Sequence, residues 1–419
     1  MTALNLHEET GLSSLARGLV GSEILKIARE ISSLTEKGKQ ICNLTVGDFS
    51  PKQFRIPRKL EQLVAEALAA GETNYPPSEG VKDLRVAVVR FYQEALALNY
   101  PLESTLIACG SRPLIFAVYS AIVDPGDKVV YPTPSWNNNH YTYLVRGVPA
   151  EIVVGPQTNF LPTAAQMRPL IRDARLLCVN TPLNPTGTVM ARDEVEAIGR
   201  LVVEENARRA DRGERPLYLM WDQVYWMLTF GENRHYAPPQ LVPESARWTI
   251  IVDGISKAFA ATGLRVGWSV APPHVSARMR DILGHVGAWA PRPEQIAVAR
   301  FLGMREEIDR FHEEMIRGLQ LRLNLLYDGF ESMRRDGLPV RAIVPQGAIY
   351  LSAQFQFPGR TNEEIRKLLL DRAGFAAVPF QAFGLKREDG WFRLSAGAVS
   401  PEEIESGLRR VREALQSLG

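Results

Sequence analysis

Apolar residues recur along this chain at two different spacings, and each spacing predicts a different kind of element. Between residues 22 and 37 they recur every three or four positions, which is the spacing of one face of an amphipathic helix. Ser22 is placed to cap the start of that helix. Two more helices are predicted at about residues 57–70 and 80–98, on either side of a polar loop at residues 73–80.

The middle of the chain alternates short apolar runs with helical or polar stretches. Such alternation indicates an α/β fold with a mostly parallel central sheet and helices on both faces. Ligands bind beyond the carboxyl ends of the strands in such sheets, so residues that directly follow a strand are the first candidates for chemistry. We predict strands at residues 106–108, 128–131, 151–154, 176–179, 217–221 and 249–252.

The last third of the chain has a different order of elements, which is typical of a smaller α+β domain. Its predicted elements are long helical patterns from 297 to 335, strands near 340 and 349, a helix at 362–373, a strand at 391–395 and a helix at 401–418. We predict a large domain of residues 48–300 and a small domain that combines residues 1–47 with residues 301–419.

Composition excludes several classes of function. The 419 residues are 45% hydrophobic and 23% charged, and the net charge of +2 favours neither nucleic acid nor a membrane surface as a partner. Residues 1–9 carry acids where a secretory peptide has basic residues, and no run reaches the roughly 20 apolar residues of a membrane span. Cys42, Cys109 and Cys178 lie in apolar runs, which predicts reduced thiols in the core and a cytoplasmic protein. We expect no metal, and the charged stretch 204–215 is predicted to be a helix end with an exposed loop.

Lys257 stands among small residues in the stretch 254–267, eight positions before Arg265. A lysine can form an imine with an aldehyde, and an arginine can hold a phosphate. Gly263 allows the chain to turn tightly between them. The alternative is a surface lysine and a surface arginine at an ordinary turn.

Other candidates follow predicted strands. Gly110, Ser111 and Arg112 open a helix whose free N–H groups could bind an anion, although a plain helix cap explains the same residues. Asn184, in Asn-Pro-Thr-Gly, also fits a proline-rich turn. Asp222 could form a charge-assisted hydrogen bond to a protonated ring nitrogen, or cap a helix.

Two more residue types stand out by their context. Arg393 lies in an otherwise apolar strand, and a buried arginine needs an anion such as a carboxylate; the alternative is an internal salt bridge. Trp136 follows a strand and offers a flat aromatic face, although a tryptophan is also a common core residue.

From about residue 22 to the final helix, these motifs in this order resemble the class I/II aminotransferases, fold type I enzymes that bind pyridoxal 5′-phosphate (PLP). The resemblance implies that Lys257 carries PLP as a Schiff base and that Asp222 faces its ring nitrogen. It further implies contacts to PLP from Gly110, Ser111, Arg112, Trp136, Asn184, Tyr225 and Arg265.

The resemblance also implies how substrate and subunits are arranged. Arg393 and Gly47 would bind the substrate α-carboxylate together with Asn184. Tyr75 matches a tyrosine that reaches the phosphate bound by the other subunit, so a homodimer with shared sites is implied. The chain departs from many relatives at Gly254, where they carry a phosphate-binding serine, and Ser256 is the candidate replacement. The turn at 46–49 also differs from their Gly-x-Pro-x-Phe form.

The implied function is transfer of an amino group from an L-amino acid to a 2-oxo acid by a ping-pong mechanism. Arg112 or Arg292 could meet the distal carboxylate of aspartate or glutamate, whereas Trp136, Tyr350 and Trp289 could line a pocket for aromatic side chains. The alternative is a PLP-dependent lyase of the same fold, either a carbon–sulfur lyase or a cyclopropane-carboxylate synthase. A regulator would need a basic DNA-binding extension, and none is found before Ser22.

Overall fold

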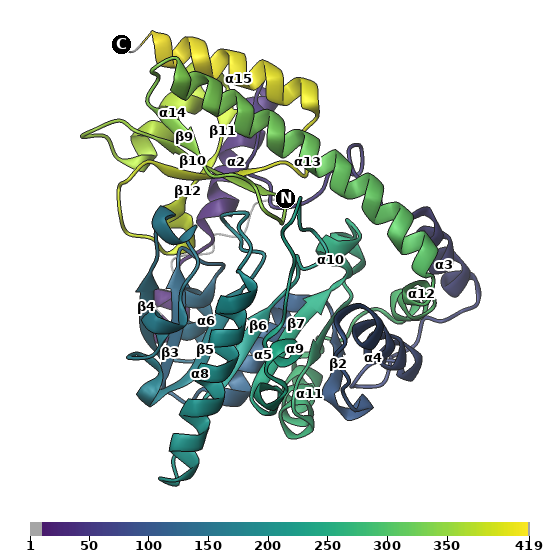
Figure 1. The fold of residues 1–419 in the computed structure, drawn as a ribbon. Coiled ribbons are helices and arrows are strands. Elements are labelled where there is room, and N and C mark those ends of the chain that lie inside the picture. The colour runs from purple at the N-terminus through teal and green to yellow at the C-terminus, as the bar shows by residue number, and fades with distance from the viewer. Residues whose placement is uncertain (1–10, 418–419) are drawn as a thin grey trace.

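The computed structural model describes residues 11–417, and its largest element is a central sheet in the order β2-β8-β7-β6-β5-β3-β4 (Figure 1). Only β8 runs antiparallel, to both β2 and β7, so the predicted mostly parallel sheet is confirmed. The strands are β2 (Thr105–Ala108), β3 (Lys128–Thr133), β4 (Val148–Val153), β5 (Ala174–Asn180), β6 (Tyr218–Asp222), β7 (Thr249–Gly254) and β8 (Gly267–Val270).

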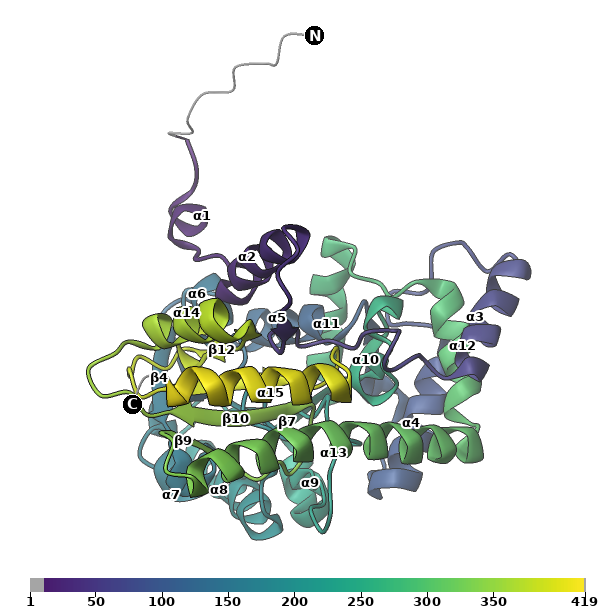
Figure 2. The same ribbon diagram turned by 90° about the horizontal axis from the view of Figure 1, so that it is seen from above.

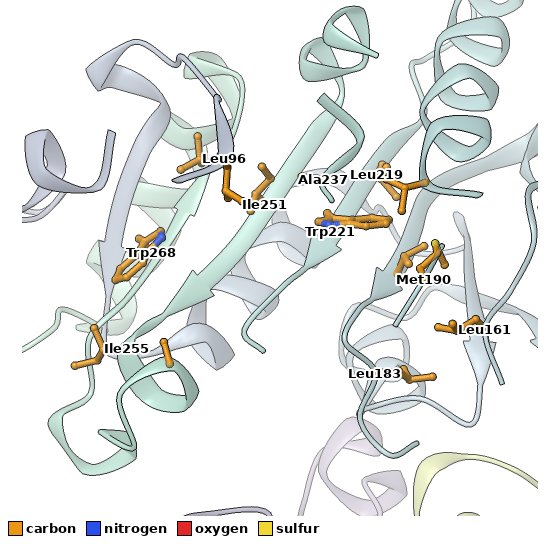
Figure 3. Close-up of a cluster of buried hydrophobic side chains, with 14 of the residues drawn as sticks. Leu96, Leu161, Leu183, Met190, Leu219, Trp221, Ala237, Ile251, Ile255 and Trp268 are labelled. Carbon is orange, nitrogen blue, oxygen red and sulfur yellow. The ribbon is translucent and has the colours of Figure 1, made fainter. Parts of the chain in front are cut away.

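Helices bury both faces of this sheet because successive strand residues point to opposite sides. Met220 and Ile250 pack in one core with α5 (Ser111–Ile122) and α11 (Pro273–Val286). Trp221 and Ile251 pack in the other core, part of which Figure 3 shows. That second core also contains side chains of α4 (Lys82–Leu96), α8 (Arg192–Ala210) and α12 (Arg292–Leu302).

The C-terminal part builds a separate antiparallel sheet, β12-β13-β10-β9. Its strands are β9 (Val340–Ala342), β10 (Tyr350–Phe355), β12 (Val378–Pro379) and β13 (Trp391–Ser395). The helices α13 (Arg305–Arg335), α14 (Asn362–Ala373) and α15 (Pro401–Gln416) cover it (Figures 1 and 2).

An early segment joins this C-terminal part. The short strand β1 (Cys42–Asn43) pairs in parallel with β11 (Phe375–Ala376), so residues more than 330 positions apart share one small sheet. The division into a domain of residues 48–300 and a domain that unites residues 1–47 with 301–419 stays a prediction. The prediction for residues 1–9 concerns residues outside those that the structure describes.

Two local expectations need correction. Ser22 precedes α2 (Glu23–Glu36), but its side chain makes no capping hydrogen bond. Cys109 is only half-buried, unlike the other two free cysteines. The stretch 204–215 is the end of α8 followed by an exposed turn, as predicted; within the helix, Glu205 and Arg209 are buried as a pair. Between residues 11 and 417, no helix is both long and apolar enough to cross a membrane.

Candidate functional site

Three neighbouring strands of the central sheet end at one cavity of about 600 Å³. Asn180 ends β5 and pairs in register with Asp222, which ends β6; the Asn180 Nδ2 group donates to the Asp222 backbone oxygen at 2.9 Å. Lys257 lies in the single turn α10 (Ile255–Ala258) directly after β7. The cavity is lined by Gly47, Ser111, Arg112, Trp136, Asn184, Asp222, Tyr225, Ser256, Lys257, Arg265 and Arg393, among others.

The turn at residues 46–49 holds the Lys257 amine in the cavity. Its Nζ donates to the backbone oxygen of Gly47 at 2.7 Å. Burial, together with the nearby cations Arg393, Arg112 and Arg265, lowers the pKa of Lys257 to about 8, even though Asp48 acts to raise it. A useful fraction of this amine is therefore unprotonated near neutral pH.

Gly254 begins the turn that carries Lys257, and it leaves no room for a side chain. A Cβ atom there would lie 2.8 Å from both Gly267 Cα and the Val266 oxygen. A serine at this position would therefore require the backbone of β8 to move. The hydroxyl available nearby belongs to Ser256, which is half-buried and lines the cavity.

The start of α5 forms an anion cradle with Arg265. Gly110 has φ +91° and is the residue before the helix, so the expectation that Ser111 caps the helix is wrong: Ser111 is its first residue, and no side chain caps it. The N–H groups of the first turn therefore have no helical partner. Arg265 donates to Cys109 O at 2.9 Å and to Thr262 O at 2.6 Å, which fixes its guanidinium beside this loop. Free N–H groups and a fixed cation together suit a phosphate.

Asp222 is a buried carboxyl group without a cationic partner in the described chain. Its side chain is 6% exposed and accepts one hydrogen bond, from Val224 N at 3.3 Å. Burial raises the pKa of Asp222 to about 7. A ligand that brings a protonated nitrogen to this carboxyl group would stabilise its charged form.

Arg393 is the corresponding unpaired cation. It is 1% exposed and donates to Thr45 O at 2.6 Å and to Asn184 Oδ1 at 3.3 Å, while its Nε has no partner. Within residues 11–417 no carboxylate forms a salt bridge with it, so the internal salt bridge considered from the sequence is absent. Burial lowers the pKa of Arg393, which an anionic ligand would reverse.

Two tyrosines pack against Arg393. The hydroxyl groups of Tyr225 and Tyr350 lie 2.6 Å apart, and the Arg393 guanidinium lies 4.7 Å from the centre of the Tyr350 ring. Sequence reasoning named Tyr350 only as an aromatic lining residue and missed its bond to Tyr225. The two residues are 125 positions apart, and no local motif connects them.

The cavity mouth combines a cation with apolar side chains. The Arg112 guanidinium lies 5.0 Å from the centre of the Trp136 ring. Ile24, Leu25 and Ala28 of α2 line the same cavity and were missed as site residues. The sequence signal was the apolar face predicted for residues 22–37, to which Leu25 belongs. In the structure the Leu25 side chain is 60% exposed.

Four predicted site residues do not line the cavity of this chain: Gly110, Tyr75, Trp289 and Arg292. Tyr75 is 82% exposed and packs edge-on against Trp289, with ring centres 5.5 Å apart. Arg292 is not free, since its Nε lies 2.6 Å from Glu72 Oε2. The role predicted for Tyr75 involves a second subunit, and the roles of Tyr75 and Arg292 stay predictions. In the part of the chain that is described, no group of three or more His, Cys, Asp or Glu side chains could hold a metal ion.

Unpaired charges at the carboxyl ends of parallel strands define this molecule as an α/β protein with an enzyme-like site for anionic ligands. Comparison with known proteins identifies the family to which the chain belongs. The family model for aminotransferase class I and II matches residues 39–411, so the chain belongs to this family and is an aminotransferase.

Relatives of known name cover the chain almost completely. It is 31% identical to a probable aspartate/prephenate aminotransferase of Thermus aquaticus, over 97% of this chain and 100% of that protein. The aspartate/prephenate aminotransferase of Thermus thermophilus is 30% identical, with 97% and 99% covered. The structure of the Thermus thermophilus aspartate aminotransferase with maleate superimposes with a TM-score of 0.86 at 29% identity, covering 97% of this chain and all of that one.

Proposed function

We propose that this aminotransferase uses PLP and takes its amino group preferentially from aspartate or glutamate, passing it to a 2-oxo acid in a ping-pong reaction. The observation that carries the proposal is the single cavity in which Lys257, Asp222 and Arg393 meet, each without an ion-pair partner in the described chain. These three groups match an aldehyde, a protonated ring nitrogen and a carboxylate, respectively.

The cradle at the start of α5 tests whether PLP fits. A Cβ atom at Gly110 would lie 2.2 Å from Arg265 Nη2, and one at Gly267 would lie 2.5 Å from the Gly110 carbonyl carbon. The glycines therefore let β8 and Arg265 approach a backbone loop whose N–H groups suit a phosphate. Ser111, Ser256 and Arg265 would hold this phosphate, and Trp136 would cover the ring.

When bound, PLP would supply an aldehyde for a primary amine and a ring that withdraws electrons. The chain supplies the rest. The Lys257 amine, with its lowered pKa, can accept a proton from the substrate Cα and return one. Asp222 would hold the proton of the ring nitrogen, while Asn184 and Tyr225 would donate to the phenolic oxygen.

Residues on the opposite side of the cavity would orient the substrate. Arg393 would hold the α-carboxylate through a bidentate pair, with the Gly47 backbone against it. Arg112, which has no salt bridge in the described chain, would meet a distal carboxylate. The names of the relatives, aspartate and aspartate/prephenate aminotransferase, support this preference.

Aromatic amino acids are a second candidate donor class. Trp136, Ile24 and Leu25 form an apolar surround for Arg112. A structural neighbour named aromatic aminotransferase, from Pyrococcus horikoshii, has a TM-score of 0.82 at 26% identity. A lyase of the same fold would use the same lysine but would not leave an aminated cofactor.

We further propose that the protein is a homodimer in the cytoplasm. Tyr75 is the most exposed large aromatic residue of the described chain and packs against Trp289. An exposed tyrosine of this kind suits a contact with a second copy, where it would reach the partner's phosphate site.

The experiment is to incubate the purified protein with PLP, reduce it with borohydride and map the modified peptide by mass spectrometry. The pyridoxyl group should be found on Lys257, and its rate of attachment should rise with pH and level off above about 8, because the neutral amine reacts. In a separate sample that is not reduced, aspartate alone should convert the bound cofactor to its amine form. Modification of another lysine, or release of ammonia and an oxo acid without the aminated cofactor, contradicts the proposal.

A further inference from the structure

A second buried carboxyl group lies beside the cavity and has no part in the roles above. Asp253 is 0% exposed and lies in β7, one residue after Val252, the partner in register of Asp222. Because side chains alternate along a strand, Asp253 leaves the opposite face of the sheet from Asp222. Gln223, which follows Asp222, shares the face of Asp253.

Three donors converge on the Asp253 carboxyl group. Its Oδ2 accepts from Tyr92 Oη at 2.8 Å and from Trp226 Nε1 at 2.8 Å, and its Oδ1 accepts from Gly254 N at 2.7 Å. The indole and backbone N–H groups can only donate. No described group accepts a hydrogen bond from this carboxyl group, which favours the carboxylate over the acid.

The next contacts fix the direction of the Tyr92 hydroxyl. Tyr92 Oη accepts from Gln223 Nε2 at 3.2 Å and from Trp268 Nε1 at 3.1 Å, so its single proton remains for Asp253. Gln223 Oε1 lies 3.2 Å from His235 Nε2, and burial lowers the pKa of His235 to about 3, so this imidazole is neutral. The whole network therefore directs donors toward Asp253.

No cation neutralises Asp253 within the network. Its direct partners are a tyrosine, a tryptophan and a backbone N–H. A glutamine and a second tryptophan are bonded to that tyrosine, the neutral His235 lies one step further, and Asp222 is on the adjacent strand. Burial, with a smaller contribution from the charge of Asp222, raises the pKa of Asp253 to about 7, even though its hydrogen bonds act to lower it. Because every hydrogen bond in this network is donated toward Asp253, we take its carboxyl group to be ionised.

We propose that Asp253 is a positioning residue that acts through Asp222: its buried negative charge makes this end of the cavity select a ligand ring with a protonated nitrogen. The proposal rests on the proposed function, since that ring belongs to PLP. Two carboxylates at adjacent strand ends repel each other, and a cationic ring at Asp222 relieves that repulsion. Asp253 itself does not line the cavity.

The test compares two ligands by equilibrium dialysis, PLP and its 1-deaza analogue, in which a C–H group replaces the ring nitrogen. Asp253→Asn should weaken PLP binding about tenfold, which corresponds to about 1.4 kcal/mol. Binding of the 1-deaza analogue should be unchanged, because its ring carries no positive charge. A purely structural role would weaken both ligands equally, and that result overturns the proposal.

Two further variants complete the experiment. Tyr92→Phe removes one donor but keeps the carboxylate, and it should give a smaller loss of about threefold, again for PLP only; it also serves if Asp253→Asn does not fold. Glu205→Gln removes a buried charge far along the chain in α8 and should affect neither ligand. If wild type and Asp253→Asn bind PLP equally, the role of Asp253 is overturned but the proposed function is not. If wild type binds neither ligand, both the role of Asp253 and the proposed function are overturned.

Discussion

Charges are buried in two regions of this molecule, under α8 and in the cavity, and the two regions treat them differently. Under α8, Glu205 Oε1 lies 2.7 Å from both Arg208 and Arg209. Arg209 also donates to three backbone oxygens, those of Ile171, Ala174 and Arg215. In the cavity, Lys257, Asp222 and Arg393 have only neutral partners in the described chain.

The difference separates structural charges from functional ones. Burying a charge costs several kcal/mol, so a charge that serves the fold is paired within the chain. A charge left unpaired keeps that cost until a ligand supplies the partner, and it marks the surface that the ligand contacts. Under α8 the chain satisfies its own charges; in the cavity a ligand has to do so.

The largest effect should come from Lys257→Met, which removes the amine and keeps a side chain of similar length. Turnover of aspartate with a 2-oxo acid should fall by at least about 10³-fold, because both covalent attachment and proton transfer are lost. Lys52→Met, at an exposed position, should leave turnover unchanged. Initial-rate measurements check both, and residual turnover near the wild-type level would contradict the assigned role.

The same variant should stabilise the cofactor-free protein near neutral pH. The pKa of Lys257 is lowered from 10.5 to about 8 on folding, so the unfolded chain binds its proton more tightly and the folded state carries a penalty. That penalty is full below about 8 and disappears as the pH rises towards 10.5. In urea unfolding, the advantage of Lys257→Met should shrink over this range; a constant advantage would exclude the lowered pKa.

A medium effect is expected under α8, and on stability instead of activity. Arg209→Ala leaves Glu205 buried with Arg208 alone, and breaking a buried pair costs about 3 kcal/mol. Arg212→Ala, an exposed arginine in the turn after α8, should change the free energy of unfolding little. Urea unfolding and specific activity measured together should show a less stable but fully active Arg209 variant. Loss of activity without loss of stability would remove the distinction between the two regions.

The smallest effect is expected at the cavity mouth, where Arg112 is exposed and water weakens its charge. Arg112→Leu should lower kcat/KM for aspartate about tenfold relative to an aromatic amino acid, because the distal carboxylate loses its cation. Arg292→Leu is the matched control. If it produces the shift and Arg112→Leu does not, the distal carboxylate is bound by Arg292, which is paired with Glu72 in this chain.

The sequence by itself determined the elements and the residues that follow them. Apolar spacing is a local property, so the strands before Asn184, Asp222 and Lys257 were predictable, and the strand-end rule made those three residues candidates. Arg393 stood out because an arginine in an apolar strand is costly unless it meets an anion.

Only the tertiary structure decided which groups contact one another. Tyr92 and Asp253 are 161 positions apart and Asn184 and Arg393 are 209 apart, so no motif contains either pair. The charged helix end at 204–210 gave no sign that Glu205 and Arg209 are buried as a pair, because local sequence does not reveal which side of a helix the rest of the chain covers. Spacing determines the backbone locally, whereas pairing of buried polar groups depends on packing between distant segments.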